Sequence, residues 1–219
     1  DTFKFEKPES LYIGDYEGDM ISIGSDHISL LVTPEHRMLI KKKKKDGYSE
    51  PVIVKAESLP KGFRLQSSAA IDTEDGDERD YFEGFLYGFF LGDGYRKNQD
   101  TIQFHLKKPR KIDSILLCLH EIDKHIYRCM VGKDGSTTIT VNIKDIKMYG
   151  KSFEKKVDES SFFESKKYMR GKLDGLMESD GSRKRSSMAF STTSAQLKDS
   201  AIRLGTMLGF YVKESSGVP

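Results

Sequence analysis

The sequence contains no long hydrophobic run and few cysteines, and its positive and negative charges nearly balance. No stretch of about 18 apolar residues occurs, so no membrane span is predicted, and the first residues lack the basic and then apolar pattern of a signal peptide. We therefore expect a soluble, cytoplasmic protein. The net charge is +2, from 36 basic and 34 acidic residues. Any attraction to a polyanion must then depend on where the charges lie and not on their total.

The chain has only two cysteines, Cys118 and Cys129. Both lie in apolar or strand-like surroundings, and their spacing matches no metal-binding motif. The pattern favours two buried free thiols, as is usual in a reducing compartment, over a disulfide.

The length and the residue pattern predict an α+β protein with two domains. The 219 residues have 37% hydrophobic content, enough for one large core or two small ones. Residues 10–70 are short strand-like runs broken by turns, which indicates a small all-β unit. Residues 67–80 are small or acidic and have no periodicity. We therefore predict a β domain over residues 1–72 and a second domain over 73–219.

The second domain contains an internal repeat. The segments "EGFLYGFFLGDG" (83–94) and "RGKLDGLMESDG" (170–181) both read as helices that end on Asp-Gly, and their equivalent positions lie 87 residues apart. Each is followed by strand and helix patterns, and a short helix is expected over 145–153. The repeats span about 79–160 and 161–219, and the second copy is incomplete.

Glycines form a stripe on one face of each of these two helices. The first stripe contains Gly84, Gly88 and Gly92, and the second contains Gly171 and Gly175. Each interior glycine costs about 1 kcal/mol relative to alanine, and a bare stripe offsets this cost when another backbone packs closely against it. We expect the two helices to pack on each other along these stripes. Gly94 and Gly181 are expected to cap them in the left-handed conformation.

Such packing would bring Asp93 and Asp180 together at the C-terminal ends of two helices. Helix dipoles disfavour anions there by about 0.3–1 kcal/mol each. Two carboxylates in such a place favour a hard divalent cation, and Mg²⁺ is the usual one at a phosphate-cleaving site. A single Asp-Gly pair is more often only a turn, but two copies with matched glycine stripes favour the metal site.

The motifs "LYGFFLGDG" and "LDGLMESDG" resemble the two LAGLIDADG motifs of homing endonucleases, and the resemblance covers about residues 79–219. It implies a monomer with internal pseudo-twofold symmetry, built from two αββαββα-like repeats, that cuts double-stranded DNA with Mg²⁺ or Mn²⁺. It also implies that Asp93 and Asp180 are catalytic metal ligands and that the carbonyl oxygens of Gly92 and Ser179 assist them. By position, His105 and Ser191 resemble polar residues that hold water near the metals, and Lys213 resembles a catalytic lysine near the scissile phosphates.

Basic and amide residues follow each aspartate, where DNA contacts would be needed. The candidates are Arg96, Lys97, Gln103, His105, Lys107, Arg183, Lys184, Arg185 and Ser191. Alternation along 102–107 predicts one polar and one apolar strand face, although a polar face is also what a merely solvated strand shows. The lysine run 41–45 is equally consistent with a solvated hairpin tip and with a DNA contact.

The β unit carries a second resemblance. "LLVTPEHRMLI", with Thr33 and His36, resembles the Thr-x-x-His block of Hedgehog/intein (Hint) domains, and "VKAESLPKGFRL" resembles the segment that follows it. This implies that His36 assists, and Thr33 supports, an acyl shift at a splice junction with a flanking host protein. No Cys or Ser stands in the expected junction block and no His-Asn ends the chain, so we expect no complete splicing from it.

The combined interpretation is an intein-type, site-specific LAGLIDADG endonuclease with a partial Hint domain. One alternative is a LAGLIDADG protein that binds nucleic acid without cutting it, such as a maturase or a regulator. Another is a mainly self-splicing intein that carries a passenger endonuclease. The presence of both Asp93 and Asp180 favours cleavage, because a protein that only binds needs neither.

Overall fold

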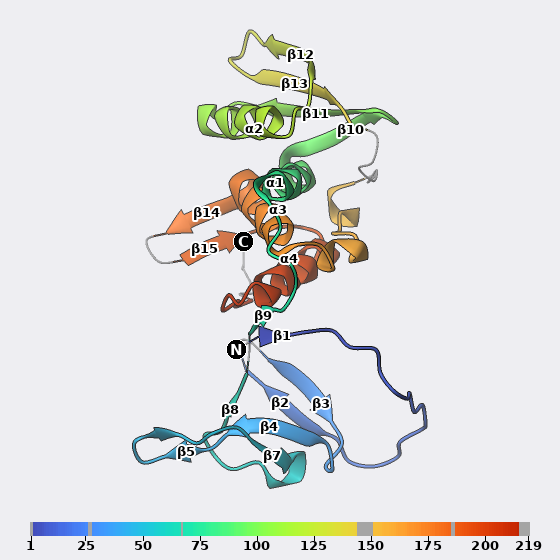
Figure 1. Ribbon diagram of the computed structural model, residues 1–219, viewed down its shortest axis with the longest axis vertical. Coiled ribbons are helices and arrows are strands. Elements are labelled where there is room, and N and C mark those ends of the chain that lie inside the picture. Colours follow the sequence, from blue (N-terminus) through green and yellow to red (C-terminus); the bar gives the residue numbers. More distant parts are fainter. Residues whose placement is uncertain (1, 26–27, 67, 144–150, 185–186, 215–219) are drawn as a thin grey trace.

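A computed structural model describes residues 2–25, 28–66, 68–143, 151–184 and 187–214 of the chain. Its α-helices are α1 (Glu78–Asp93), α2 (Pro109–Glu121), α3 (Lys166–Asp180) and α4 (Ala195–Met207), and its short 3-10 turns are η1 (Ala56–Ser58), η2 (Ser152–Glu154) and η3 (Glu159–Phe162). Figure 1 shows α1 and α3 side by side at the centre, with the strands arranged around them. None of the helices in these ranges is both long and apolar enough to cross a bilayer.

The N-terminal part is built from short strands, as its turn-broken pattern predicts. The strands are β2 (Ile21–Gly24) paired with β3 (Ser29–Val32), β4 (Arg37–Lys41) between β7 (Val52–Lys55) and β8 (Arg64–Leu65), and the hairpin β5 (Lys43–Lys44) with β6 (Gly47–Tyr48). Met38, Ile40 and Ala56 form a small core of their own. The predicted boundary segment contains a short strand, β9 (Ala70–Ile71), which pairs in parallel with β1 (Thr2–Phe3).

Each glycine helix is followed by an antiparallel strand pair and a further helix. After α1 come β10 (Gly94–Asn98) and β11 (Thr101–Leu106), then α2, β12 (Ile126–Val131) and β13 (Thr137–Asn142). These four strands form one sheet in the order β10-β11-β13-β12. After α3 come β14 (Gly181–Lys184), β15 (Ser187–Phe190) and α4. The predicted repeat is therefore present, whereas the helix expected over 145–153 falls mostly outside the described residues.

The glycines of α1 and α3 lie against the backbone of the opposite helix. A Cβ atom at Gly84 would overlap the Tyr168 carbonyl, and one at Gly171 would overlap the Tyr81 carbonyl. One turn further, a Cβ at Gly88 would overlap the Lys172 carbonyl, and one at Gly175 would overlap the Phe85 carbonyl. Each contact maps onto another when 87 residues are added to or subtracted from its numbers. The predicted packing along glycine stripes is confirmed, and it is reciprocal.

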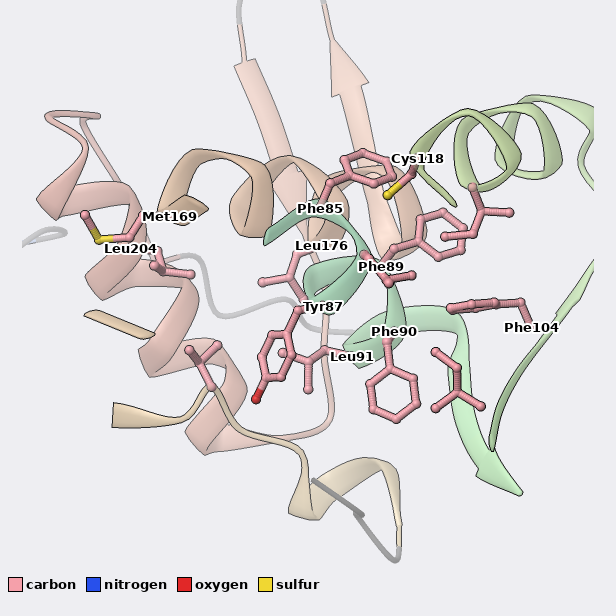
Figure 2. Packing of buried hydrophobic residues seen from close by; sticks show 14 of the residues in the cluster. Phe85, Tyr87, Phe89, Phe90, Leu91, Phe104, Cys118, Met169, Leu176 and Leu204 are labelled. Atoms are coloured by element: carbon pink, nitrogen blue, oxygen red, sulfur yellow. The ribbon is translucent and has the colours of Figure 1, made fainter. Parts of the chain in front are cut away.

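Large apolar side chains surround this helix pair and form the main core. Residues 84–91 of α1 are all buried, as is expected of a helix covered on every side. Figure 2 shows Phe89 on the side of Phe104, with their ring centroids 5.5 Å apart, and Tyr87 on the opposite side of α1. Because α1 contacts both the strands and α3, it joins the two repeats through one continuous core.

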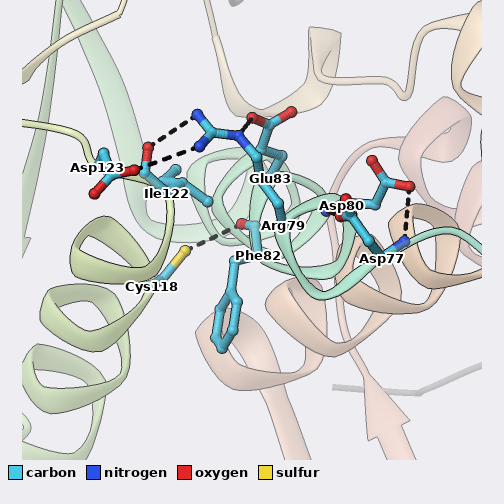
Figure 3. A network of polar contacts seen from close by, with 8 residues as sticks. All are labelled: Asp77, Arg79, Asp80, Phe82, Glu83, Cys118, Ile122 and Asp123. Carbon is cyan, nitrogen blue, oxygen red and sulfur yellow. Dashed lines mark hydrogen bonds and ion pairs between the residues drawn. The ribbon is translucent and has the colours of Figure 1, made fainter.

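The start of α1 is fixed by polar contacts that lie upstream of the expected helix start. The Asp77 side chain accepts a hydrogen bond from the Asp80 nitrogen (2.9 Å), and the Asp80 side chain accepts one from the Asp77 nitrogen (3.3 Å). This capping box places the first helical residue at Glu78. Figure 3 shows that Arg79 also donates to the Ile122 carbonyl (3.2 Å), which joins the start of α1 to the end of α2.

The expected left-handed caps at Gly94 and Gly181 are not found. Gly94 has φ −90° and ψ 155°, and Gly181 has φ −88° and ψ 162°, so both residues are extended and begin the next strand. A Cβ at Gly94 would lie 2.8 Å from the Phe90 carbonyl oxygen, and one at Gly181 would lie 2.7 Å from the Met177 Cα. Glycine is needed here because the chain turns directly from helix to strand past the last helical turn, and not because of a positive φ.

The two cysteines have different environments, although both were expected to be buried. Cys118 of α2 is buried, and its thiol lies 3.1 Å from the Phe82 carbonyl oxygen (Figure 3). Burial raises the pKa of the Cys118 thiol to about 12. Cys129 is exposed because β12 is the outer strand of its sheet, and every residue of β12 after Ile126 is exposed. Both thiols are free, as predicted.

Candidate nucleic-acid interface and carboxylate pair

The two aspartates that end α1 and α3 lie together, as the stripes predict. A Cβ at Gly92 would overlap the Ser179 hydroxyl and would lie 3.2 Å from Oδ2 of Asp180. Partial burial and the charge of Asp93 raise the pKa of Asp180, and Lys111 and Lys155 lower it in part. The C-terminal ends of the two helices therefore form one electrostatic site, which we call the carboxylate pair (Asp93 and Asp180).

Two lysines that were not predicted from the sequence lie at the carboxylate pair. Lys111, in the first turn of α2, forms an ion pair with Asp93, and the two side chains are only 12% and 23% exposed. Lys155 donates to the Gly92 carbonyl oxygen (2.9 Å). Burial lowers the pKa of Lys155, while Asp180 and Asp93 raise it in part. The two ammonium groups thus offset the charges of two carboxylates that would otherwise repel each other.

The surrounding elements hold these lysines in place. Ser194, the buried N-cap residue of α4, donates to the Lys155 carbonyl (2.6 Å) and so fixes the segment that carries this lysine. Next to Lys111, Arg110 forms an ion pair with Glu178 of α3 (3.2 Å), whose side chain is 9% exposed. Cations in the first turn of a helix are unfavourable unless they are paired. The sequence "PRK" at 109–111 was therefore a usable signal for nearby acids, whereas Lys155 follows no recognisable pattern.

The donor atoms of the carboxylate pair suit a hard divalent cation. The candidate ligands are the carboxylates of Asp93 and Asp180 and the carbonyl oxygens of Gly92 and Ser179, which are all oxygen donors of the kind that Mg²⁺ prefers. The two lysines occupy part of this donor set, because Lys111 binds Asp93 and Lys155 binds Gly92. No group of three His, Cys, Asp or Glu side chains suited to a metal occurs in the described part of the chain.

A polar ladder crosses one face of the four-stranded sheet. Tyr95, Gln103, Thr140 and Arg128 are direct neighbours across β10, β11, β13 and β12. Gln103 donates to the Thr140 hydroxyl (2.8 Å) and accepts from the Tyr95 hydroxyl. In the next row, Nδ1 of His105 lies 3.0 Å from the Thr138 hydroxyl. We call these six residues the polar ladder.

The opposite face of this sheet is apolar, so the predicted alternation along β11 is confirmed. Ile102, Phe104 and Leu106 are buried, whereas His105 and Lys107 are exposed. Gln103 is the exception on the polar face, because its neighbours in the ladder cover it and leave it 8% exposed. Thr138, Thr140 and Arg128 belong to the same face but were not among the predicted residues, since pairing between distant strands is not visible in sequence alternation.

The other predicted residues have varied positions. Lys97 is exposed on β10, Ser191 is exposed just after β15, and Lys107 forms an ion pair with Asp134 (2.8 Å). Arg96 instead lies on the register of Ile102 and donates to the backbone carbonyl of Asn98 (3.0 Å).

The backbone of Arg183 and Lys184 lies in β14, and Arg185 lies outside the described residues. Lys213 is exposed beyond α4, and the ammonium groups beside the carboxylate pair belong to Lys111 and Lys155.

Thr33 and His36 lie at a turn between β3 and β4. The His36 nitrogen donates to the Thr33 carbonyl (3.0 Å), and the His36 carbonyl accepts from the Ala56 nitrogen (2.9 Å). The His36 side chain is exposed. These backbone bonds show how the turn is held, and the splicing-related role of the two side chains stays a prediction.

Comparisons with known proteins give a distant structural likeness. No protein-family profile matches the chain, and no curated protein matches it. Among solved structures, full-length DUF199/WhiA from Thermatoga maritima is similar over 50% of this chain and 36% of its own, with 20% identity and a TM-score of 0.38. The N-terminal LAGLIDADG domain of DUF199/WhiA is similar over 51% of this chain and 54% of its own, with 24% identity and a TM-score of 0.36.

Neither of these structures is described as an intein, a Hint domain or an endonuclease. The chain spans well under two thirds of the length of each. Its own geometry is what the two sequence motifs predict: two helices packed through glycine, each followed by an antiparallel strand pair and a further helix. The chain therefore has an α+β fold whose arrangement resembles that expected from the LAGLIDADG motifs.

Proposed function

We propose that this chain binds double-stranded DNA and reads base edges with the polar ladder. The observation that carries the proposal is the row of Tyr95, Gln103, Thr140 and Arg128 across four adjacent strands. A guanidinium group makes the commonest specific contact with base edges in the major groove, and the covered Gln103 holds the hydroxyls of Tyr95 and Thr140 in this row. Arg128 is exposed and has no carboxylate partner within the described ranges, so its donors remain available for a ligand.

Selection from a pool of random-sequence duplexes tests this function. We expect enrichment of a defined site, and we expect Arg128→Ala to weaken binding to that site by about tenfold or more, in line with 1–3 kcal/mol per base contact. Lys198→Ala is the matched control, because it also removes one positive charge but lies on α4 in an ion pair with Glu214 (2.8 Å). Failure to enrich any sequence at low salt, or equal losses in the two variants, would overturn the proposal.

A second candidate function is metal-dependent strand cleavage at the carboxylate pair. The observation that favours it is the placement of Asp93 and Asp180 at one site together with Lys111 and Lys155. A divalent cation held there by oxygen donors would lower the pKa of water and offset charge on the phosphate. The chain's own part is to hold the two carboxylates at fixed positions and to supply two ammonium groups that attract phosphate oxygens. Binding without cleavage requires only the polar ladder.

Two substitutions distinguish binding from cleavage. If the carboxylate pair cuts DNA, Asp93→Asn and Asp180→Asn each abolish strand cleavage of the enriched duplex with Mg²⁺ or Mn²⁺, while affinity stays within about tenfold. If the chain only binds, the parent protein leaves the duplex intact under the same conditions. Cleavage that persists in either variant would exclude this carboxylate from the reaction.

A further inference from the structure

Positive charge is concentrated in one part of the small β unit. Residues 37–66 contain nine basic and three acidic residues, a net charge of +6 in a chain whose total is +2. Residues 1–36 contain two basic and eight acidic residues, and residues 67–80 contain one basic and six acidic residues. The balanced total therefore conceals a basic region between two acidic ones.

The basic residues of this region gather on one hairpin and the adjoining sheet. Lys42 to Lys45 are all exposed, and the hairpin β5–β6 presents them. The Ser49 nitrogen donates to the Lys42 carbonyl (2.9 Å), and the Lys42 nitrogen donates to the Ser49 hydroxyl (2.9 Å), so the hairpin is closed at its base. Lys43 pairs across the hairpin with Tyr48, and the Arg64 guanidinium lies 3.9 Å from the centre of the Tyr48 ring.

Like charges face each other across the strands of this sheet. Lys41 is the direct partner of Arg64, and Arg37 is the direct partner of Lys55. Like charges in directly opposed positions destabilise a sheet, and positions that break a local rule of this kind are often functional. We call the residues Arg37, Lys41 to Lys45, Lys61 and Arg64 the basic face.

The members of the basic face have no carboxylate partner in the described part of the chain, in contrast to basic residues elsewhere. On α3, for example, Lys166 pairs with Asp75 (3.1 Å), Lys167 with Glu78 (2.6 Å) and Arg170 with Asp174 (2.8 Å). In the basic region only Lys55, which lies outside the face as defined, has such a pair, with Glu57 at 3.4 Å. Within the described residues, the basic cluster of α3 is neutralised by carboxylates, whereas the basic face is not.

We propose that the basic face is a second DNA-contacting surface, which binds the phosphate backbone of the duplex that the polar ladder reads. This inference rests on the proposed DNA-binding function. Exposed lysines on a closed hairpin suit phosphate, because such contacts need positive charge and little directional geometry. Figure 1 shows the small β unit and the four-stranded sheet at opposite ends of the molecule. A duplex that reaches both surfaces extends beyond the site that the ladder reads.

The salt dependence of DNA affinity tests the inference. A triple variant, Lys43→Gln, Lys44→Gln and Lys45→Gln, removes three exposed charges at the hairpin tip. The slope of log Kd against log salt should fall by up to about 2.7, because each lost phosphate contact contributes about 0.9. The matched control is Lys166→Gln, Lys167→Gln and Lys198→Gln, which removes three lysines that are paired with carboxylates. The control should change the slope by less than one contact.

Duplex length provides a second readout. The parent should gain affinity as the enriched site is extended by flanking sequence, and the hairpin triple variant should gain none. Equal slopes in the two triple variants would mean that only total charge matters, which overturns the inference. If the hairpin variant matches the parent while Arg128→Ala still loses binding, the inference fails and the proposed function stands. If the parent binds no duplex, both fail.

Vesicles of phosphatidylserine and phosphatidylcholine separate DNA from a membrane as the partner. We expect no binding of the parent to these vesicles at a salt concentration at which it binds DNA. Vesicle binding that the hairpin triple variant loses, combined with unchanged DNA affinity, would assign the basic face to an anionic membrane and overturn the inference. Circular dichroism of each variant confirms that these surface changes leave the fold intact.

Discussion

The two repeats place equivalent residues in the same interface, yet one position differs sharply between them. Phe85 of α1 corresponds to Lys172 of α3, 87 residues later. Phe85 stacks with Phe89 at 6.0 Å between ring centroids. Lys172 is fully buried, and its Nζ has no hydrogen-bond partner in the described part of the chain. The interface tolerates a phenyl ring in one repeat and an ammonium group in the other because the backbone contacts, and not these side chains, are symmetric.

Aromatic rings make the buried lysine tolerable. Its Nζ lies 4.2 Å from the centre of the Tyr87 ring and 4.5 Å from that of the Tyr168 ring. Cation–π contacts of this kind offset part of the cost of burying a charge. Burial nevertheless lowers the pKa of Lys172 to about 7, and the nearby charges of Glu164 and Asp158 raise it only in part. The second repeat therefore carries the unfavourable free energy of a buried ammonium group, which the first repeat does not.

The largest predicted effect concerns the glycine contacts that the two repeats share. Gly88→Leu and Gly175→Leu should each destabilise the protein by at least about 3 kcal/mol, because the atoms that would be overlapped are backbone and cannot rotate away. Urea unfolding measures the free energies. Gly24→Leu is the control, since nothing lies within 4 Å of a Cβ there. Unequal losses at Gly88 and Gly175 would show that the interface is not reciprocal.

The next largest effect concerns the position that differs between the repeats, which is Phe85 in the first and Lys172 in the second. Lys172→Met should stabilise the fold by about 1–3 kcal/mol at pH 6, since it removes a buried ammonium group without a hydrogen-bond partner. The reciprocal change, Phe85→Lys, should destabilise it, because Phe85 is buried and stacks on Phe89. Thermal melts of the two variants at one pH test this pair. A less stable Lys172→Met would mean that the aromatic rings more than compensate for burial of the charge.

The same lysine predicts how stability depends on pH. Its pKa is about 7 in the folded state and 10.5 when unperturbed, so between these values the unfolded chain binds more protons. The parent should therefore gain stability as pH rises from about 7 to 9, by up to about 1.4 kcal/mol per pH unit from this group. Lys172→Met should lack this gain. Urea unfolding of both proteins at several pH values gives the difference, and parallel curves would contradict the assignment.

The smallest effect concerns the two aspartates, which are equivalent in the repeat but differ in their partners. Asp93→Asn breaks the largely buried ion pair with Lys111 and should destabilise the fold. Asp180→Asn removes a carboxylate whose pKa is raised, so the variant should be more stable than the parent at any pH above that pKa. The gain should be no more than about 1 kcal/mol, because Asp180 keeps contact with solvent. Melting temperatures in chelator test this contrast. Added Mg²⁺ should narrow the gap for Asp180→Asn if the cation binds the parent.

Much of this fold was predictable because the spacing of glycines in the sequence shows which helix faces carry no side chains. The spacing of Gly84 and Gly88 predicts close backbone contact, and the same spacing at Gly171 and Gly175 identifies the partner. The conformation of Gly94 was not predictable, because a glycine at the end of a helix is required either by a positive φ or by a lack of room for a side chain. Lys155 was missed because a long-range contact from an irregular segment leaves no periodic trace.

Exposure was harder to predict than secondary structure. The strand that contains Cys129 was expected and found, but the sequence does not say whether a strand is central or at the edge of its sheet. The polar ladder was missed for the same reason, because Thr140 and Arg128 come to lie in one row with Gln103 only through the register of three strands. Local pattern predicts the elements, whereas the composition of a surface follows from pairing between distant segments.

The reciprocal glycine contacts make the helix pair a rigid spacer. Because backbone carbonyls fill the space that side chains would occupy, α1 and α3 have no slack in which to slide or rotate past each other. The strand pairs that follow the two helices are thereby held at a fixed separation. In the proposed complex, a duplex that touches both of them would have to match this separation, and the ease of deforming its uncontacted steps would then contribute to which sequences bind.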